Sequence, residues 1–569
     1  MFNRVFKRVN ISRTFTGTTT GLFAVTLAVF ISVMLAAWRM RHGLALVGDS
    51  GSYLAGASGF SQGRWFESPL VPSFSELPLL DTVNNGGWSS FADFGFGAPM
   101  IIAIFDVVLP LHTAAGLVNV LAIGCIAAAI MFGPWTPQRA MEWWTRSLLA
   151  ISVSCWPILR FTGVAVLSEP VFCAVILWIA VIVARLGKTS PGTTRSTGSP
   201  RSSRPPGISV LISLGVLTLI AGFTRFVGPI VAIVVAILLI QRGLSWRRAS
   251  LWVMATGLVP SLVTALATGG TRTWTFHSRD SSDVFFLARG VGGWFEAGMG
   301  DQTDTLLRLS FQPSLLDWFI SIASIAGAVW ILWWWLRLGV TKTSASVDTE
   351  ISPRSPLEPA LVLGAALALA VVPSMFFLDA ILKLENRIMM PTGLLIISAG
   401  GWWLARRSSR TMSPGSKSRG LISRGFISPS FISRGAVCLW AIVATQPWNW
   451  LERPAPSEPT RLTAAVDGLG AKYVVTNQAD LVWWHTGVPA RYLPSGFFDR
   501  SARSYDPEPI MTALPCALAI NGGAVVVDTV AGLPSRIQEQ LSADVAAGHY
   551  DEMEIEPGVF AYWPTGLNC

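Results

Sequence analysis

Apolar stretches long enough to cross a lipid bilayer recur from end to end of this 569-residue chain. A membrane-spanning helix needs about 20 predominantly apolar residues, and the first such stretch runs from Gly21 to Trp38. Hydrophobic residues make up 51% of the chain, and charged residues only 13%. Within a membrane the backbone must satisfy its own hydrogen bonds, which long helices do. The sequence therefore predicts an α-helical polytopic membrane protein.

Apolar windows of about twenty residues place about eleven spans along the chain. They lie at residues 21–38, 112–132, 147–162, 164–184, 208–222, 226–241, 249–267, 316–336, 357–378, 388–405 and 436–448. Polar Arg39, Arg41 and His42 follow the first span, where a signal peptide would have a small-residue cleavage site. We expect this span to remain in the mature protein as a signal anchor.

Basic residues alternate between the loops that connect these spans. If the N-terminus is cytoplasmic, the loops on its side are basic, and those on the other side are poor in Lys and Arg near the membrane. The cytoplasmic set is Arg139, Arg146, Arg185, Lys188, Arg195, Arg201, Arg204, Arg242, Arg247, Arg248, Arg337, Lys342, Arg354 and the residues from Arg406 to Arg434. This asymmetry follows the positive-inside rule. The net charge of +9 thus reflects plasma-membrane topology and requires no nucleic-acid partner.

The same topology predicts that function lies on the extracytoplasmic side. That side receives the loop at 39–111, the loop at 268–315, a short loop at 379–387 and the tail after about residue 448. Two cytoplasmic loops rich in Ser and Arg, 187–207 and 406–434, are expected to be solvated linkers or contacts to anionic membrane lipids.

The tail has the composition of a small α/β domain. We place a transmembrane domain at 1–450 and an extracytoplasmic α/β domain of about 120 residues at 451–569, within the usual size of one domain. Short β-branched or aromatic runs occur at 473–476, 481–484, 524–528 and 559–563, with one helical pattern at 534–547.

Two further features of the tail have alternative explanations. Trp483, Trp484 and His485 lie in a hairpin-like segment, which suits core packing of the domain or contact with a glycan acceptor. Cys516 and Cys569 both lie in this oxidising setting, so a disulfide between them is predicted. The spacing of cysteine and histidine does not predict a zinc site.

Polar residues gather at the extracytoplasmic ends of the predicted spans. They lie in Gly48-Asp49-Ser50-Gly51-Ser52-Tyr53-Leu54, in Ser168-Glu169-Pro170, in Thr224-Arg225, at His277 and Arg279, and at Asp379 and Asn386-Arg387. A charge in or beside an apolar span costs a few kcal/mol unless it faces a partner or a water-filled cavity. Their common side predicts a shared polar cavity. For each charged residue alone, a structural ion pair is the alternative.

These motifs resemble those of the GT-C fold glycosyltransferases, polytopic enzymes that take a sugar from a polyprenyl-phosphate carrier on the outer side of the membrane. The resemblance rests on Asp49 and Tyr53 after the first span, Ser-Glu-Pro at 168–170, Thr-Arg-Phe-Val-Gly-Pro at 224–229 and Asn-Arg-Ile-Met-Met-Pro at 386–391. Residues 471–487 are similar to the soluble C-terminal part of bacterial members, especially actinobacterial ones. The resemblance implies a GT-C-like fold, a polyprenyl-phosphate-linked sugar donor and a glycan, lipid or protein acceptor in the cell envelope.

The chemistry of such a transfer suits the residues at these positions. The acceptor hydroxyl must lose a proton as it attacks, and Asp49 is the candidate base. The phosphate leaving group needs fixed cations, for which the planar fork of arginine is well matched. The expected substrate-binding residues are Tyr53, Glu169, Arg225, His277, Arg279 and Arg387. A single displacement predicts inversion of the anomeric centre.

We expect this chemistry to need no metal cofactor. Metal-dependent relatives such as the oligosaccharyltransferases carry an acidic-x-acidic pair in the first external loop, whereas Ser50 and Gly51 follow Asp49 here. The other acidic residues of that loop, Glu67, Glu76, Asp81 and Asp93, lack the spacing. The lipid A aminoarabinose transferase and protein O-mannosyltransferase branches are the nearer analogy. A structural calcium ion stays open as an alternative.

A transporter or flippase of a lipid-linked glycan is the competing function, because it too would carry charges within a membrane cavity. Transporters usually contain repeated halves with broken helices related by symmetry. The predicted spans show no such internal repeat, which favours the transferase.

Overall fold

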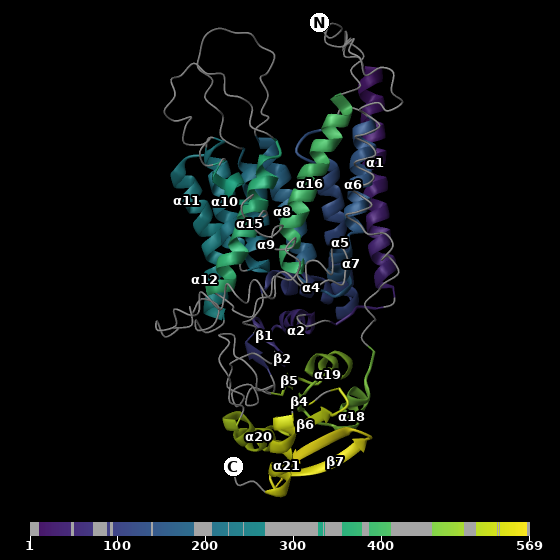
Figure 1. Ribbon diagram of the computed structural model, residues 1–569, viewed down its shortest axis with the longest axis vertical. Coiled ribbons are helices and arrows are strands. Elements are labelled where there is room, and N and C mark those ends of the chain that lie inside the picture. The colour runs from purple at the N-terminus through teal and green to yellow at the C-terminus, as the bar shows by residue number, and fades with distance from the viewer. Residues whose placement is uncertain are drawn as a thin grey trace, which may run out of the picture.

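The computed structural model of the chain has a bundle of helices with a smaller α/β unit at one end (Figure 1). The residues described are 11–41, 43–46, 50–71, 88–90, 95–137, 140–186, 207–225, 227–242, 244–267, 328–333, 335, 356–377, 386–410, 458–493, 508–531, 533 and 535–565. We call the end of the bundle next to the α/β unit the domain side, and the opposite end, where the first helix begins at Ile11, the far side.

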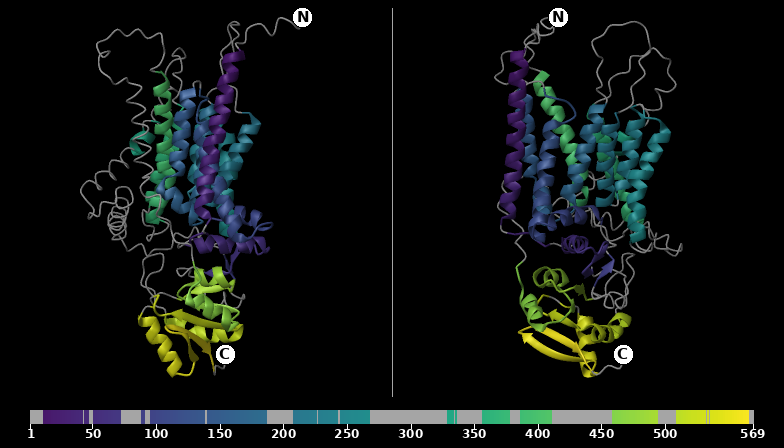
Figure 2. Two further views of the ribbon diagram at one scale, coloured as in Figure 1. Left: turned by 90° about the vertical axis from the view of Figure 1, so that its right-hand side faces the viewer. Right: turned by 180° about the vertical axis from the view of Figure 1, so that it is seen from behind.

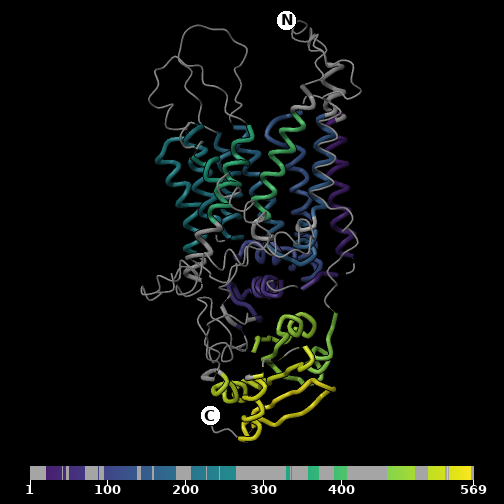
Figure 3. The backbone as a smooth tube through the Cα atoms, viewed as in Figure 1, coloured from purple at the N-terminus to yellow at the C-terminus, as the bar shows by residue number. Residues whose placement is uncertain are grey.

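Antiparallel helices build the bundle. They are α1 (Ile11–Met40), α5 (Leu111–Phe132), α6 (Ala140–Ser154), α7 (Pro157–Val164), α8 (Glu169–Leu186), α9 (Ile208–Thr224), α10 (Gly228–Ile240), α11 (Trp246–Val253), the π-helical turn η2 (Met254–Leu258), α12 (Val259–Ala267), α15 (Glu358–Phe377) and α16 (Asn386–Arg410). Two short helices, α2 (Ser50–Ser61) and α4 (Gly97–Asp106), lie at the domain side, between the long helices and the α/β unit (Figure 3).

Three of the described helices are long and apolar enough to cross a membrane: α1 from Gly21, α5 and α8. They differ in how far other helices enclose them. The apolar window of α8 is 78% buried, whereas that of α1 is only 28% buried. Accordingly, α8 lies within the bundle (Figure 1), and α1, coloured purple, runs along its outside (Figure 2).

The third predicted span, 147–162, is wrong as a single helix. Helix α6 ends at Ser154, and α7 begins at Pro157. Proline lacks the backbone N–H that a continuing helix needs, but it fits the first turn of a new one. Of the predicted span at 316–336 the structure describes 328–333 and 335, and the one at 436–448 lies outside the described residues.

Arginine side chains cap α5 at the far side. Arg146 Nη1 donates to the carbonyl oxygens of Met131 and Phe132, at 3.0 and 2.9 Å, and Arg185 Nε donates to that of Gly133 at 3.0 Å. The last carbonyl groups of a helix have no partner within the helix. These two arginines, predicted as topological signals, therefore also satisfy the end of a buried helix.

The α/β unit is built on a six-stranded mixed sheet with strand order β2-β5-β4-β6-β8-β7. The strands are β2 (Leu70–Val71), β4 (Tyr473–Thr476), β5 (Ala490–Tyr492), β6 (Gly523–Asp528), β7 (Tyr550–Glu556) and β8 (Val559–Pro564), and the helices are α18 (Arg461–Leu469), α19 (Ala479–Thr486), α20 (Glu508–Asn521) and α21 (Ser535–Ala546). The strands from β2 to β6 pair in parallel, and β8 and β7 pair antiparallel. Every residue of β4 and β6 is buried, as expected for central parallel strands covered on both faces.

The interpretation of Leu481–Trp484 as a strand-like run and of Trp483-Trp484-His485 as a hairpin is wrong, because this segment is helix α19. Its buried residues Ala479, Val482 and Trp483 are spaced three and four apart, which places them on one face of a helix. The predicted runs at 473–476, 524–528 and 559–563 correspond to β4, β6 and β8. Cys516 is disulfide-bonded, and Cys569, its predicted partner, lies outside the described residues.

Strand β2 comes from the first predicted external loop and joins the sheet of the tail. Leu70 and Val71 pair in parallel with Ala490 and Arg491 of β5. Helix α2 of the same loop packs on α19 so closely that a Cβ at Gly51 would lie 2.9 Å from Asp480 Cβ. The tail unit and the first loop thus share a sheet and a helix interface. A second small sheet in this loop pairs β1 (Glu67–Ser68) with β3 (Ser89–Ser90).

Candidate functional site

Three of the residues predicted for the site meet at the domain side: Tyr53, Glu169 and Arg225. They come from α2, from the first turn of α8 and from the residue that follows α9. Arg387 lies in the first turn of α16, of which only the backbone is described there. The other predicted site residues, Asp49, His277 and Arg279, lie outside the described residues.

Arg225 and Glu169 form an ion pair between two antiparallel helices. Arg225 Nη2 donates to Glu169 Oε1, and the two side chains are 19% and 3% exposed. The pair matches the helix dipoles, since Glu169 sits at a helix N-terminus and Arg225 at a helix C-terminus. Among the described residues, neither Glu169 Oε2 nor Arg225 Nε has a hydrogen-bond partner. The pair therefore leaves hydrogen-bonding capacity unused at a nearly buried position.

The turn before α8 is held by polar contacts from α2. The hydroxyl groups of Tyr53 and Ser168 are hydrogen-bonded at 3.0 Å, and Ser50 Oγ donates to the carbonyl oxygen of Ala165. Within this turn Val166 has a φ of 51°, a left-handed conformation that a β-branched residue rarely adopts. Such strain costs about 1–3 kcal/mol and persists only where surrounding contacts enforce it. These contacts fix the position of Glu169 at the start of α8.

An apolar cluster of buried side chains lies beside the polar residues. Tyr53, Phe96, Ala165 and Leu167 form its centre, and Phe66 packs on it. The rings of Phe66 and Phe96 meet edge to face, with centroids 4.6 Å apart. Apolar walls lower the local dielectric, so a charge interacts more strongly there than in water.

Helix α4 makes close contact with the end of α9 that precedes Arg225. A Cβ at Gly97 would lie only 2.5 Å from Thr224 Oγ1, so the approach requires glycine. Thr224 Oγ1 itself donates to the carbonyl oxygen of Ile220 at 2.6 Å. The end of α9 is thus pinned between α4 and α8, which limits the positions open to the Arg225 side chain.

This arrangement can bind an anion. A guanidinium group carries five N–H donors in a planar fork, and one Arg225 nitrogen is used by Glu169. The hydroxyl groups of Tyr53 and Ser168 lie in the same region and are hydrogen-bonded to each other, so one of their two O–H donors is already used. In the part of the chain that the structure describes, no group of three or more His, Cys, Asp or Glu side chains is placed to hold a metal ion.

Sequence reasoning named the three charged or aromatic members of this site but missed the role of Ser50. Its hydroxyl group anchors α2 to the turn before α8 and is fully buried. The signal was present, because Ser50 directly follows Asp49 at the predicted mouth of the first span. The partner of Tyr53, Ser168, was recognised only as part of a polar tripeptide.

Two solved structures illustrate what this structure is similar to in fold. One is the structure of ArnT from Cupriavidus metallidurans bound to undecaprenyl phosphate, with 11% sequence identity, a TM-score of 0.47 and coverage of 95% of this chain and 97% of that one. The other is the archaeal oligosaccharyltransferase AglB from Archaeoglobus fulgidus in complex with an inhibitory peptide and a dolichol-phosphate, with 12% identity, a TM-score of 0.49 and coverage of 96% and 74%. No protein-family model and no curated protein matches the sequence.

Proposed function

We propose that this chain is a membrane glycosyltransferase that moves a sugar from a polyprenyl-phosphate donor to an extracytoplasmic acceptor. The observation that supports it best is the position of Arg225, nearly buried at the domain side and paired through one nitrogen with Glu169. A phosphate group at this position would accept hydrogen bonds from the remaining donors of the guanidinium group. Glu169 would orient the arginine, and Tyr53 would border the sugar-phosphate.

The proposed step is a single displacement at the anomeric carbon. The acceptor oxygen forms the new bond as the bond between that carbon and the phosphate oxygen breaks, and Asp49 takes the proton of the acceptor hydroxyl. The electron pair leaves with the lipid phosphate, whose growing charge Arg225 stabilises together with Arg387. His277 and Arg279 are the next candidates for this role. The configuration at the anomeric carbon inverts.

The proposed orientation places the domain side outside the cytoplasm. Arg185, Arg242, Arg247 and Arg406 all lie at the far side, in or next to the ends of helices there. By the positive-inside rule this is the cytoplasmic side. In intact cells, a membrane-impermeant thiol reagent should label a Glu539→Cys variant, in the exposed part of α21, and should not label Arg247→Cys. The reverse pattern would place the α/β unit in the cytoplasm.

The test of the function compares donor binding and transfer in the full-length protein in nanodiscs. Arg225→Ala should weaken binding of undecaprenyl phosphate by about 10- to 100-fold, because hydrogen bonds to a charged group contribute about 1.5–3 kcal/mol. Arg461→Ala is the matched control, since Arg461 is exposed and donates to the carbonyl oxygen of Pro557 in the tail. Unchanged binding in Arg225→Ala would move the phosphate site elsewhere.

Transfer itself is measured by single turnover with a panel of polyprenyl-phosphate sugars. We expect one member of the panel to lose its sugar to an acceptor glycan, lipid or protein. If none does, but the lipid crosses the bilayer in vesicles containing the protein, the chain is a flippase and the transferase proposal fails.

A further inference from the structure

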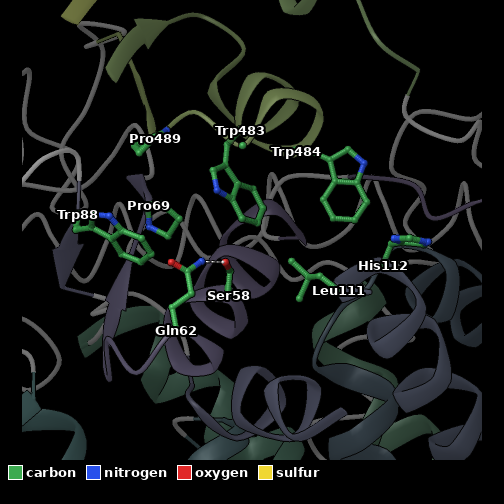
Figure 4. A pocket seen from close by; sticks show the side chains of 10 residues that line it. Ser58, Gln62, Pro69, Trp88, Leu111, His112, Trp483, Trp484 and Pro489 are labelled. Atoms are coloured by element: carbon green, nitrogen blue, oxygen red, sulfur yellow. Dashed lines mark hydrogen bonds between the residues drawn. The ribbon is translucent and has the colours of Figure 1, made fainter. Parts of the chain in front are cut away.

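A cavity lies between the bundle and the α/β unit, and neither residue of the ion pair at the proposed donor site lines it. Its volume is about 600 Å³, within the usual range of about 300–1,000 Å³ for pockets that bind small molecules. Residues of α2, the start of α5, the first loop and α19 line it (Figure 4). It therefore exists only because the tail unit packs on the first loop.

Three tryptophan side chains line this cavity. Trp483 projects into it from α19, with Trp88 on one side and Trp484 on the other in the view of Figure 4. The rings of Trp483 and Trp484 are tilted by 50°, with centroids 6.3 Å apart. The guanidinium group of Arg64 lies 4.6 Å from the centre of the Trp88 ring. An aromatic face is electron-rich and attracts the C–H groups of a sugar ring.

The polar residues of the cavity suit hydroxyl groups better than charges. Gln62 Nε2 donates to Ser58 Oγ at 2.8 Å, and both side chains line the cavity with His112 (Figure 4). Amide, hydroxyl and imidazole groups both donate and accept hydrogen bonds, as sugar hydroxyl groups do. Among the described residues that line the cavity, none is Asp, Glu, Lys or Arg. The nearest described cation, Arg64 on the Trp88 ring, is paired with Glu67 at 3.4 Å, so its charge is partly balanced. This composition favours a neutral saccharide over a phosphate or a charged peptide.

Helix α2 connects the cavity with the proposed donor site. Ser58 follows Tyr53 by five residues, which corresponds to about 8 Å along the helix axis and about 140° around it. Tyr53 is buried against the turn before α8, whereas Ser58 borders the cavity. A molecule that occupies both places must therefore be extended.

We infer that this cavity binds a neutral saccharide unit of an oligosaccharide acceptor, at a distance from the unit that receives the new sugar. This inference rests on the proposed glycosyltransferase function. It assigns the acceptor to the class of glycan chains, and it assigns Trp484, Trp88 and Gln62 to acceptor binding.

The experiment measures saccharide binding without any donor, on the full-length protein in nanodiscs. The probes are linear hexasaccharides of mannose, of arabinose and of glucose, the three corresponding monosaccharides, and an unglycosylated decapeptide rich in serine and threonine. Saturation-transfer NMR and tryptophan fluorescence report binding. We expect at least one hexasaccharide to bind at least 10-fold more tightly than its monosaccharide.

Variants locate the binding. Trp484→Ala should weaken hexasaccharide binding by about 10-fold or more, as truncation of a central aromatic contact does in other interfaces. Gln62→Ala, at an exposed position, should weaken it several-fold. Trp65→Ala is the matched control, since Trp65 is 63% exposed and is not among the residues that line the cavity. The Trp65→Ala variant should bind the hexasaccharide as tightly as the wild type does.

The outcomes separate this inference from the proposed function. If no hexasaccharide binds while undecaprenyl phosphate still does, the cavity is not a saccharide site and the donor proposal stands. If the decapeptide binds instead and Trp484→Ala abolishes that binding, the acceptor is a polypeptide and the inference is overturned. If hexasaccharides bind as expected and undecaprenyl phosphate does not, the cavity assignment stands as a binding site and the donor proposal fails.

Discussion

Glu169→Gln should destabilise the bundle more than loss of both members of the ion pair. The Glu169 side chain is 3% exposed and that of Arg225 19% exposed, so water screens neither charge well. Removing one partner of a buried pair costs about 3–5 kcal/mol, whereas replacing both with apolar residues of similar volume is often neutral. Glutamine still accepts a hydrogen bond, and Arg225 retains some contact with solvent. We therefore expect the lower end, about 3 kcal/mol.

The assay is a double-mutant cycle of Glu169→Gln, Arg225→Met and the double variant, measured by reversible unfolding in mixed micelles. The double variant leaves no unpaired charge, so it should be more stable than the Glu169→Gln variant, although its buried amide keeps it below the wild type. The exposed pair of Arg64 and Glu67, at 3.4 Å with side chains 45% and 37% exposed, provides the control. Glu67→Gln should change stability by at most about 0.5 kcal/mol.

The result that would refute this reasoning is additivity. If the double variant is as unstable as the sum of the two single variants, the two charges do not stabilise each other in the folded protein. Arg225 would then be held by other contacts, and its availability to a phosphate would need a different explanation.

Three further predictions concern the base, the disulfide and the response to alkali. Asp49→Asn should lower transfer by about 100-fold or more with donor binding retained, since a positioned base supplies about 10²- to 10⁴-fold; near-normal single-turnover transfer would remove Asp49 from that role. Mass spectrometry of protein from the native envelope should find Cys516 linked to Cys569, a loop whose closure contributes about 4 kcal/mol, and two free thiols would contradict the pairing. Burial raises the pKa of the Tyr473 and Tyr550 phenols above the usual value of 10.0, so the folded tail holds protons that the unfolded chain releases. These two phenols should leave the stability of the tail unaffected below pH 10 and should lower it as the pH rises above 10, by up to about 1.4 kcal/mol per pH unit for each phenol. Circular dichroism of the full-length protein should show a smaller loss of structure at alkaline pH in the Tyr473→Phe and Tyr550→Phe variants than in the wild type. An equal loss would contradict this.

The sequence pattern predicted the long helices well and the broken ones poorly. Helices α5 and α8 are continuous apolar runs, so a window of spanning length finds them. The prediction of one helix at 147–162 was wrong because the window counted apolar residues across Pro157, where one helix ends and another begins. Helix α19 was predicted as a strand because two adjacent tryptophans favour strands locally, although its buried residues have helical spacing.

The members of the candidate site could be predicted from their position at span ends, but their contacts could not. Glu169 and Arg225 were expected on one side of the membrane, which follows from topology alone. Their direct pairing depends on α8 and α9 being neighbours, and that is a property of packing. Strand β2 was not predicted, because a strand of two residues has no periodicity and its partner β5 is distant in the chain.

The pairing of β2 with β5 has a consequence for biosynthesis. Leu70 and Val71 leave the ribosome long before Ala490 and Arg491, a delay on the order of tens of seconds at about 5–20 residues per second. During this time the edge that will pair is open, and unpaired edges attract other chains. The first loop can reach its final structure only after nearly the whole chain has been made and inserted. A protein cut short before β5 would expose that edge permanently, which would make it a substrate for quality-control proteases.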